Sequence, residues 1–194
     1  TKGGFPARFG GRLSSILEIY MKDGHMKEYH ADATVSIIAS KLTVEGPIVE
    51  DKASFMLSAR RTYLDLLIKP LISQANSNNP DVTTDPRYYF YDLNGKLNWR
   101  IGAKDRLYLS AFKGEDDFGI ASAENYGTAS STLDFGLDWK NAIQALRWNH
   151  EWGPRLFSNT TLTRSLYRFN TGIAISDISA DADSVSMAAL YNSG

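Results

Sequence analysis

The feature that most constrains this chain is a strict alternation of apolar and polar side chains, because a period of two residues is the signature of a half-buried β-strand. The alternation is clearest over residues 88–101. One side of this segment is apolar and comprises Tyr89, Tyr91, Leu93, Gly95, Leu97, Trp99 and Ile101. The other side is polar and comprises Asp92, Asn94, Lys96, Asn98 and Arg100. The segment therefore predicts a strand with one apolar and one polar face.

The pair Asn94-Gly95 lies inside this segment and is normally a strong hairpin signal. A tight turn there would place Tyr91 opposite Asn98 and would mix apolar and polar groups on both faces. A single continuous strand keeps the two faces pure. Because register follows the hydrophobic pattern, we predict the continuous strand.

The same alternation predicts further strands, which cover residues 29–39, 42–46, 53–63, 106–113, 142–152, 156–169 and 185–191. Short turns are expected at 47–52, 102–105 and 153–155, and a first hairpin near Ser40. Long polar connections are expected at 64–87, 114–141 and 170–184, and leucines and isoleucines in the first of these favour a short helix that Pro70 would limit. Alternating short turns and long loops are typical of outer-membrane barrels.

Strand length separates a membrane protein from a soluble one. Tyr89 and Trp99 lie ten residues apart on one face, which is roughly 33 Å along a strand. Tilted by about 40°, this distance projects to roughly 25 Å, the height of the apolar band of an outer-membrane barrel. Strands of soluble β-sandwiches are usually about five or six residues long. The pattern therefore favours transmembrane β-strands.

Composition excludes several classes of protein. The 194 residues include 21 basic and 22 acidic side chains, so no basic footprint for nucleic acid is present. The chain has no cysteine, which excludes disulfides and thiol catalysis. No Gly-x-Ser-x-Gly motif and no distinctive carboxylate pair occurs, so we expect neither an enzyme nor a bound cofactor. His25 and His30 would lie on opposite faces of a strand, so no metal site is expected there.

Several runs of the sequence resemble TonB-dependent outer-membrane receptors. Residues 3–19 (GGFPARFGGRLSSILEI) are similar to the end of the plug domain of that family. The runs 42–48 (LTVEGPI) and 58–63 (SARRTY) resemble its first barrel strands, and 147–150 (RWNH) with 156–160 (LFSNT) resemble later ones. The resemblance implies a 22-stranded transmembrane β-barrel, occluded by an N-terminal plug, in the bacterial outer membrane.

This family imports a scarce nutrient, such as a metal chelate, an oligosaccharide or a peptide, with energy from the inner-membrane TonB complex. The resemblance therefore implies an outer-membrane lipid environment, a nutrient ligand and a TonB partner that binds a region outside this chain. No TonB-contacting box is present, and only about eight strands are visible. We expect residues 1–24 to be the end of the plug, and residues 25–194 to be one arc of a larger all-β, antiparallel barrel wall in a longer protein.

The resemblance also suggests a contact between plug and barrel. Arg8 and Arg12 flank the glycines at 10–11, and they would pair with lumen carboxylates such as Asp32 or Glu45, with Arg60 at the same contact. A second set of residues would stack on a ligand or pack against the plug if it faces the lumen. This set comprises Tyr88, Phe90, Tyr108 and Phe112. Two other functions stay open: a passive or structural outer-membrane barrel, and a soluble β-sandwich binding module.

Overall fold

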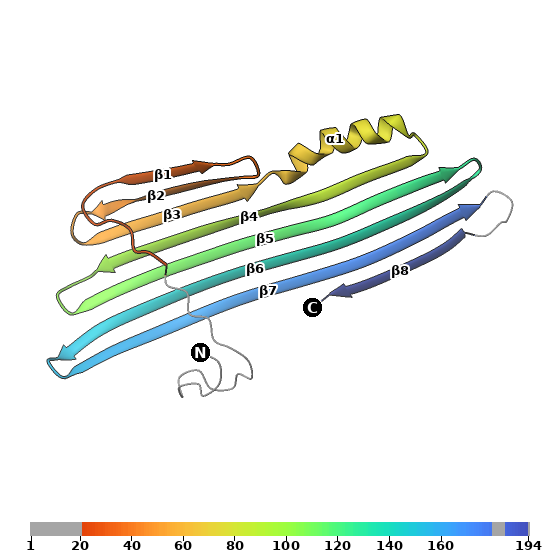
Figure 1. Ribbon diagram of the computed structural model, residues 1–194. Coiled ribbons are helices and arrows are strands. Elements are labelled where there is room, and N and C mark those ends of the chain that lie inside the picture. Colours follow the sequence, from red (N-terminus) through yellow and green to blue (C-terminus); the bar gives the residue numbers. More distant parts are fainter. Residues whose placement is uncertain (1–20, 180–184, 194) are drawn as a thin grey trace, which may run out of the picture.

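The computed structural model describes residues 21–179 and 185–193, which form one antiparallel sheet whose eight strands pair in chain order, together with one helix (Figure 1). The elements are β1 (His30–Val35), β2 (Ala39–Val49), β3 (Ala53–Thr62), α1 (Leu64–Asn78), β4 (Val82–Arg100), β5 (Asp105–Tyr126), β6 (Ala129–Gly153), β7 (Leu156–Ser179) and β8 (Val185–Ser193). Within the described residues β1 and β8 do not pair with each other, so the sheet is open. The prediction of an antiparallel β-sheet is therefore confirmed.

β4 confirms the prediction of a continuous strand and not a hairpin at Asn94-Gly95. It runs for 19 residues, and Asn94 and Gly95 pair with Ser58 and Leu57 on one side and with Phe112 and Ala111 on the other. The short turns after β2, β4 and β6 lie where they were predicted. They gather at the left end of Figure 1, which we call the left end of the sheet.

The predicted strand over residues 29–39 is wrong in one respect. The chain turns between Val35 and Ala39, where the Ser36 N–H donates to the Ala39 carbonyl at 2.8 Å and the Ser36 hydroxyl accepts the Ala39 N–H at 3.1 Å. The apolar side chain of Ile37 continued the alternation across this turn, and it is 81% exposed. A polar side-chain contact therefore ended the strand where the hydrophobic pattern did not.

The long connections predicted at 114–141 and 170–184 are also wrong. β5 and β6 continue to a hairpin whose tip contains Gly127 at a φ of 62°, and β7 continues to Ser179. These extensions form the right end of the sheet in Figure 1. The polar residues taken for loops lie on one face of long strands, and aromatic residues occupy the other face.

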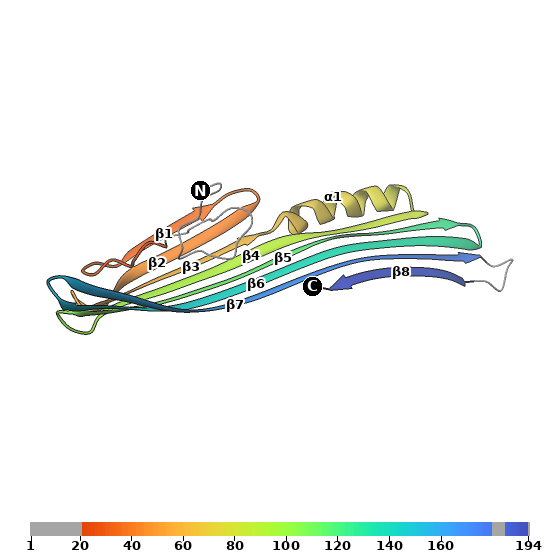
Figure 2. The ribbon, with the colours of Figure 1, turned by 90° about the horizontal axis from the view of Figure 1, so that it is seen from below.

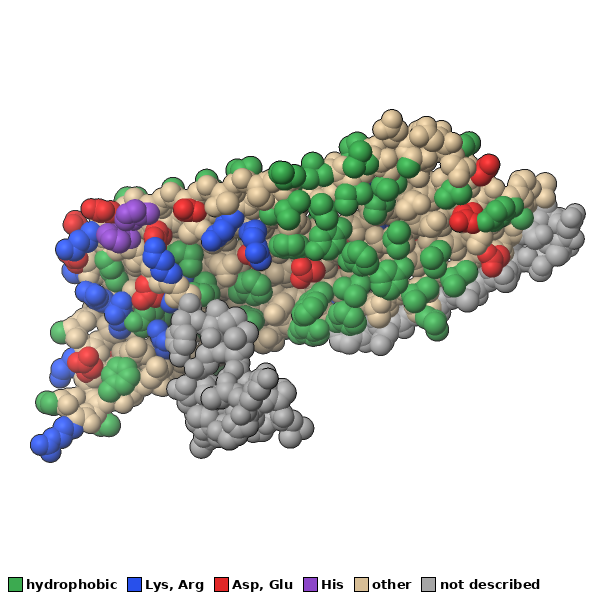
Figure 3. Space-filling view, in the orientation of Figure 1, with side chains coloured by type: hydrophobic (Ala, Val, Ile, Leu, Met, Phe, Trp, Pro, Cys, Tyr) green, Lys and Arg blue, Asp and Glu red, His purple; other side chains and the backbone are tan. Residues whose placement is uncertain are grey.

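The two faces of the sheet carry different side chains at its two ends. We call the face crossed by residues 21–28, which is turned to the viewer in Figure 3, the front face, and the opposite one the back face. In the left half, the front face is polar: Lys41, Thr43, Glu45, Ser58, Arg60, Asp92, Asn94, Lys96, Asn98, Arg106 and Arg147. The back face there forms an apolar belt: Leu42, Val44, Leu57, Leu93, Leu97, Trp99, Leu107, Leu109, Leu146, Trp148 and Leu162.

In the right half the polarity is reversed. The front face carries Tyr88, Phe90, Phe118, Ile120, Phe135, Leu137, Trp139, Phe169 and Ile173, which produce the hydrophobic surface in Figure 3. The back face carries Asp85, Arg87, Glu115, Asp117, Asp134, Asp138, Lys140 and Arg168. The reversal occurs near the facing pair Gly114 and Asn141. The period of two residues therefore continues while the identity of the apolar face changes.

Helix α1 covers an edge of the sheet. β3 ends at Thr62, so the part of β4 before Phe90 has no neighbouring strand on that side among the described residues. The Asn76 side chain replaces a strand there, because its amide donates to the Thr84 carbonyl at 2.9 Å and its carbonyl accepts the Thr84 N–H at 3.1 Å. Figure 2 shows α1 over this end of β4. The predicted helix is confirmed, but Pro70 lies inside it and does not end it.

The sheet is one layer thick (Figure 2), and its buried apolar residues among those described are Ala53, Met56 and Tyr108. Both apolar surfaces are therefore exposed: Trp99 is 51% exposed in the belt, and Phe118 is 44% exposed on the front face. Contiguous apolar surfaces of this kind mark contacts with a membrane or a partner. The described part of the chain contains no helix with the length and hydropathy needed to span a bilayer.

Candidate functional site

A segment of chain crosses the polar left half of the front face before β1 begins (Figure 1). Lys96 of β4 donates from Nζ to the Met21 carbonyl at 2.6 Å and lies 2.6 Å from Asp23 Oδ1. Arg106 of β5 lies 3.7 Å from the other oxygen of Asp23. The Lys96 side chain is only 12% exposed. We call Asp23, Lys96 and Arg106 the clasp, because they hold this segment on the sheet.

Contacts on either side of the clasp extend the attachment. Lys22 forms an ion pair with Glu45, whose side chain is 9% exposed. The Asp51 N–H donates to the Met26 carbonyl at 3.1 Å. A Cβ on Gly24 would lie 2.0 Å from the carbonyl oxygen of Phe55, so this close approach of two backbones requires glycine.

The clasp lies beside a tyrosine surrounded by cations. Tyr108 is buried, and the cationic groups of Lys96, Arg106 and Arg147 lie 5.8, 5.1 and 4.1 Å from its ring centroid. The ring face attracts cations through its quadrupole, but it carries no net charge. Asp23 is the carboxylate that the described residues supply to Lys96 and Arg106. The segment therefore brings a negative charge to a positively charged part of the sheet.

The structure brings together three of the predicted plug-contact residues. Asp32 and Glu45 line one hollow of about 390 Å³ with Lys22, and Glu45 and Arg60 line an adjoining hollow of about 350 Å³, also with Lys22. Glu45 binds Lys22, while Arg60 pairs with Asp92 at 2.6 Å. The predicted partners at positions 8 and 12, Arg8 and Arg12, lie outside the described residues, so that pairing stays a prediction.

Sequence reasoning missed the clasp itself. The alternation of β4 already placed Lys96 on the polar face, so its orientation was predictable. Nothing in a period of two residues indicates that Asp23 returns across β4 and β5, because this contact joins residues 73 positions apart, from Asp23 to Lys96. The acidic and basic residues were visible in the sequence, and their pairing was not.

The four aromatic residues considered for ligand stacking all lie on the front face, where their even positions in β4 and β5 place them. Tyr108 belongs to the surroundings of the clasp. Tyr88 packs edge-on against Phe90 and Phe118, with ring centroids 6.4 and 6.0 Å apart. Phe118 packs in the same way against Phe135 at 6.0 Å. The right half of the front face therefore presents a continuous aromatic surface.

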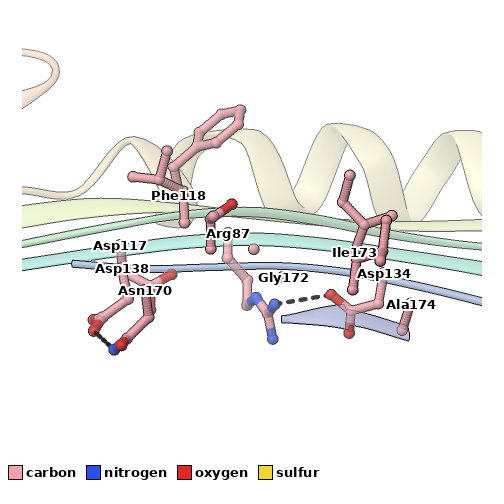
Figure 4. Close-up of a pocket in the computed structure, with 13 residues that line it drawn as sticks. Arg87, Asp117, Phe118, Asp134, Asp138, Asn170, Gly172, Ile173 and Ala174 are labelled. Carbon is pink, nitrogen blue, oxygen red and sulfur yellow. Dashed lines mark hydrogen bonds and ion pairs between the residues drawn. The ribbon is translucent and has the colours of Figure 1, made fainter. Parts of the chain in front are cut away.

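The back face contains a shallow hollow of about 430 Å³ in its right half (Figure 4). Gly136 and Gly172 face each other on β6 and β7 and form its floor. The side chain of Arg87 extends over this floor and reaches Asp134 at 3.3 Å. Figure 4 shows Arg87 and Asp134 on one side of the sheet and Phe118 on the other, which illustrates the reversed polarity of this half.

An ion pair marks the start of the charged right half of the back face, beyond the belt. Lys140 lies 3.0 Å from Glu115, and the Tyr91 hydroxyl donates to the same carboxylate at 2.8 Å. The Lys140 ammonium and then the Tyr91 hydroxyl hold the pKa of Glu115 below its usual value. In return, hydrogen bonding to Glu115 raises the pKa of Lys140.

The prediction that His25 and His30 would be separated on opposite faces is wrong. Bends before β1 bring the two rings into edge-on contact with centroids 4.7 Å apart. His25 Nδ1 accepts the N–H of Glu28 at 2.9 Å, so a turn rather than a strand determines the geometry. Among the residues that the structure describes, no group of three or more His, Cys, Asp or Glu side chains is arranged to hold a metal ion.

Comparison of the chain with protein-family models, with curated proteins and with solved structures gives no match. The belt, the clasp and the aromatic surface are therefore the features from which a function is inferred.

Proposed function

We propose that this chain is part of the wall of a TonB-dependent outer-membrane receptor that imports a scarce nutrient. The observation that carries the proposal is the reversal of polarity along the sheet. In this arrangement the belt on the back face contacts lipid, and the left half of the front face lines an enclosed, polar interior. The right half extends beyond the membrane into the external medium.

The lengths of the strands support this arrangement. β6 has 25 residues and therefore extends roughly 80 Å at about 3.3 Å per residue, far more than a bilayer requires. In β4 to β7, the belt occupies only the left half of the strand. A back face that is apolar over one stretch and charged beyond it is expected for a wall that leaves the hydrocarbon region, because lipid tails accept no charged side chains at low cost.

The clasp supports the receptor over a passive channel. In a plugged barrel, the chain must pass from the interior domain to the first strand of the wall, and it does so on the polar face. Met21 and Asp23 precede β1 and lie on that face, attached to β4 and β5. An open channel has no need of a segment fixed across its inner wall.

The soluble β-sandwich is disfavoured by the same reversal. A second sheet packs against one face of its partner, with the apolar side chains of both sheets between them. Here the apolar surface lies on the back face at the left end and on the front face at the right end. A single partner layer would leave one of the two exposed.

Single cysteines test the orientation directly, because these 194 residues contain none. Thr128→Cys lies at the right-hand hairpin and Ala103→Cys at a left-hand turn, and the full-length protein is expressed in the outer membrane of intact cells. We expect a membrane-impermeant maleimide to label position 128 in intact cells and position 103 only after the membrane is permeabilised. Equal labelling of both, or recovery of the protein in the soluble fraction, would contradict the proposal.

Planar-bilayer recordings of the full-length protein distinguish the receptor from a passive barrel. A receptor whose interior is occluded is expected to show no steady conductance. A persistent open conductance would favour the passive barrel.

A further inference from the structure

The first charged side chain beyond the belt is basic on five successive strands. Passing from the belt to the right along the back face, each of β3 to β7 carries no charged residue before a lysine or arginine. The five residues, which we call the basic collar, are Arg61, Arg87, Lys113, Lys140 and Arg164. On these strands the back-face carboxylates to the right of the belt, Asp85, Glu115, Asp117, Asp134 and Asp138, each lie beyond the basic residue of their own strand.

Three members of the collar have no carboxylate partner in the part of the chain that the structure describes. Arg87 pairs with Asp134, and Lys140 pairs with Glu115 and Asp138. Arg61, Lys113 and Arg164 form no ion pair with a carboxylate among the described residues, and all three are exposed. Lys113 lies 5.8 Å from the centre of the Tyr91 ring, which holds its ammonium at the edge of the belt.

Arg164 lies within the apolar surface itself. Its neighbours on the same face of β7 are Leu162 and Leu166, which are 72% and 54% exposed. An arginine in contact with hydrocarbon is costly unless its guanidinium reaches the interface and finds an anion there.

Lys140 and Arg168 face each other directly on β6 and β7, and facing like charges repel. The carboxylates of Glu115 and Asp138 already contact Lys140, so the cost that an added anionic group would relieve is that of Arg164.

The left edge of the belt is different. The titratable residues on the back face of the strands there are Asp105 and His150, and they contact each other at 2.6 Å. Trp148 also donates to Asp105 at 2.9 Å. On the back face of the strands, the basic side chains therefore lie at the right edge of the belt, and the charge of Asp105 at the left edge is paired with His150. The cations Lys52, Lys104 and Arg155 of the left end lie in its turns.

We propose that the basic collar binds the phosphate groups of anionic lipid in the outer leaflet of the membrane. This inference rests on the proposed function, because it requires that the belt contact hydrocarbon and that the right half face outward. The lipid is a phosphorylated amphiphile whose acyl chains lie on the belt while its phosphates contact Arg61, Lys113 and Arg164. Each basic residue near an anionic surface strengthens attachment, so the effect of the three is cumulative.

The test compares two triple variants of the full-length protein in detergent micelles that contain diphosphorylated lipid A. In the collar variant, Arg61→Gln, Lys113→Gln and Arg164→Gln remove three cations of the collar. In the matched control, Lys52→Gln, Lys104→Gln and Arg155→Gln remove the same charge from the left-hand turns. We expect lipid A bound per protein, measured by native mass spectrometry, to fall at least about tenfold in the collar variant and to stay unchanged in the control.

A third variant, with Arg61→Lys and Arg164→Lys, keeps the charge and is expected to retain binding, which separates charge loss from misfolding. Equal loss in both triple variants would overturn the inference. Competition by millimolar inorganic phosphate would also overturn it, since the site would then bind the free ion. Equal binding of phosphatidylcholine would overturn it because the anionic phosphate would then not be needed. If the protein inserts into the membrane but shows no preference for lipid A, the lipid-binding proposal alone is wrong. If the protein does not insert, the proposed function on which it rests is wrong as well.

Discussion

The left and right halves of this sheet are built from the same strands and differ in which face is apolar. In the left half, Leu97 and Trp99 of β4 point to the back, and Lys96 and Asn98 point to the front. In the right half the front face is aromatic and the back face is charged. The comparison shows that alternation establishes a strand, while the surroundings of each face decide which side is apolar. A strand that passes from one environment to another changes the polarity of its faces without changing its period.

The largest expected difference between the halves concerns a charge on the back face. Leu97→Arg places a cation in the belt, and we expect it to lower the free energy of unfolding in lipid vesicles by about 2–4 kcal/mol, as for a lipid-facing arginine near the midplane. Ala121→Arg places the same cation on the same face in the right half, opposite Asp85 and Asp134, and is expected to have little effect. Denaturant titration of the reconstituted protein measures both. Equal destabilisation would show that the two halves share one environment.

The clasp tests the polar front face of the left half. Lys96→Met removes the cation that holds Met21 and Asp23, and we expect a loss of about 1–3 kcal/mol, typical of a hydrogen bond to a charged group. Cleavage by trypsin after Lys22 and Lys27 is expected to accelerate, because the segment leaves the sheet. Lys41→Met, at an exposed site on the same face, is the control. An unchanged cleavage rate in the Lys96 variant would show that other contacts hold the segment.

In the right half, the contact of α1 with the edge of β4 can be tested. Asn76→Ala removes both hydrogen bonds to Thr84, and we expect a loss of about 1–2 kcal/mol together with faster hydrogen exchange at β4 before Phe90. Asn78→Ala, two residues along α1, is the matched control. If exchange at Thr84 does not change, the helix protects this edge by another contact.

The smallest expected effect is a dependence on pH at the junction of the halves. The pKa of Glu115 is lowered, so its contribution to stability is present above the ordinary carboxyl pKa and is lost as the pH falls through the folded value. The pKa of Lys140 is raised, so its contribution is lost as the pH rises through its own folded value. Glu115→Gln is expected to flatten the acid limb by a few tenths of a kcal/mol. Glu50→Gln, in an exposed turn, should leave that limb unchanged.

Much of the sheet was predictable from the sequence. The pure faces of residues 88–101 indicated a continuous strand through Asn94-Gly95, and the turns near 47–52, 102–105 and 153–155 were marked by glycine, proline and charged residues. The extensions of β5, β6 and β7 were not predicted, because polar residues such as Asp117 indicated a loop. Asp117 and its neighbour Phe118 in fact lie on opposite faces of β5. A strand prediction that requires the same face to stay apolar fails where the apolar side chains move to the other face.

The amino-acid sequence by itself determined the period, and with it the antiparallel ribbon and the direction in which each side chain leaves it. This follows because alternation is a property of neighbouring residues. Only the tertiary structure decided that Asp23 meets Lys96, that Asn76 completes the edge of β4, and that the cations of five strands form one collar. Asp23 and Lys96 lie 73 positions apart, and the collar depends on the register of five strands, which local periodicity does not specify. Asn76 and Thr84 are close in the chain, but their contact depends on how α1 lies against β4.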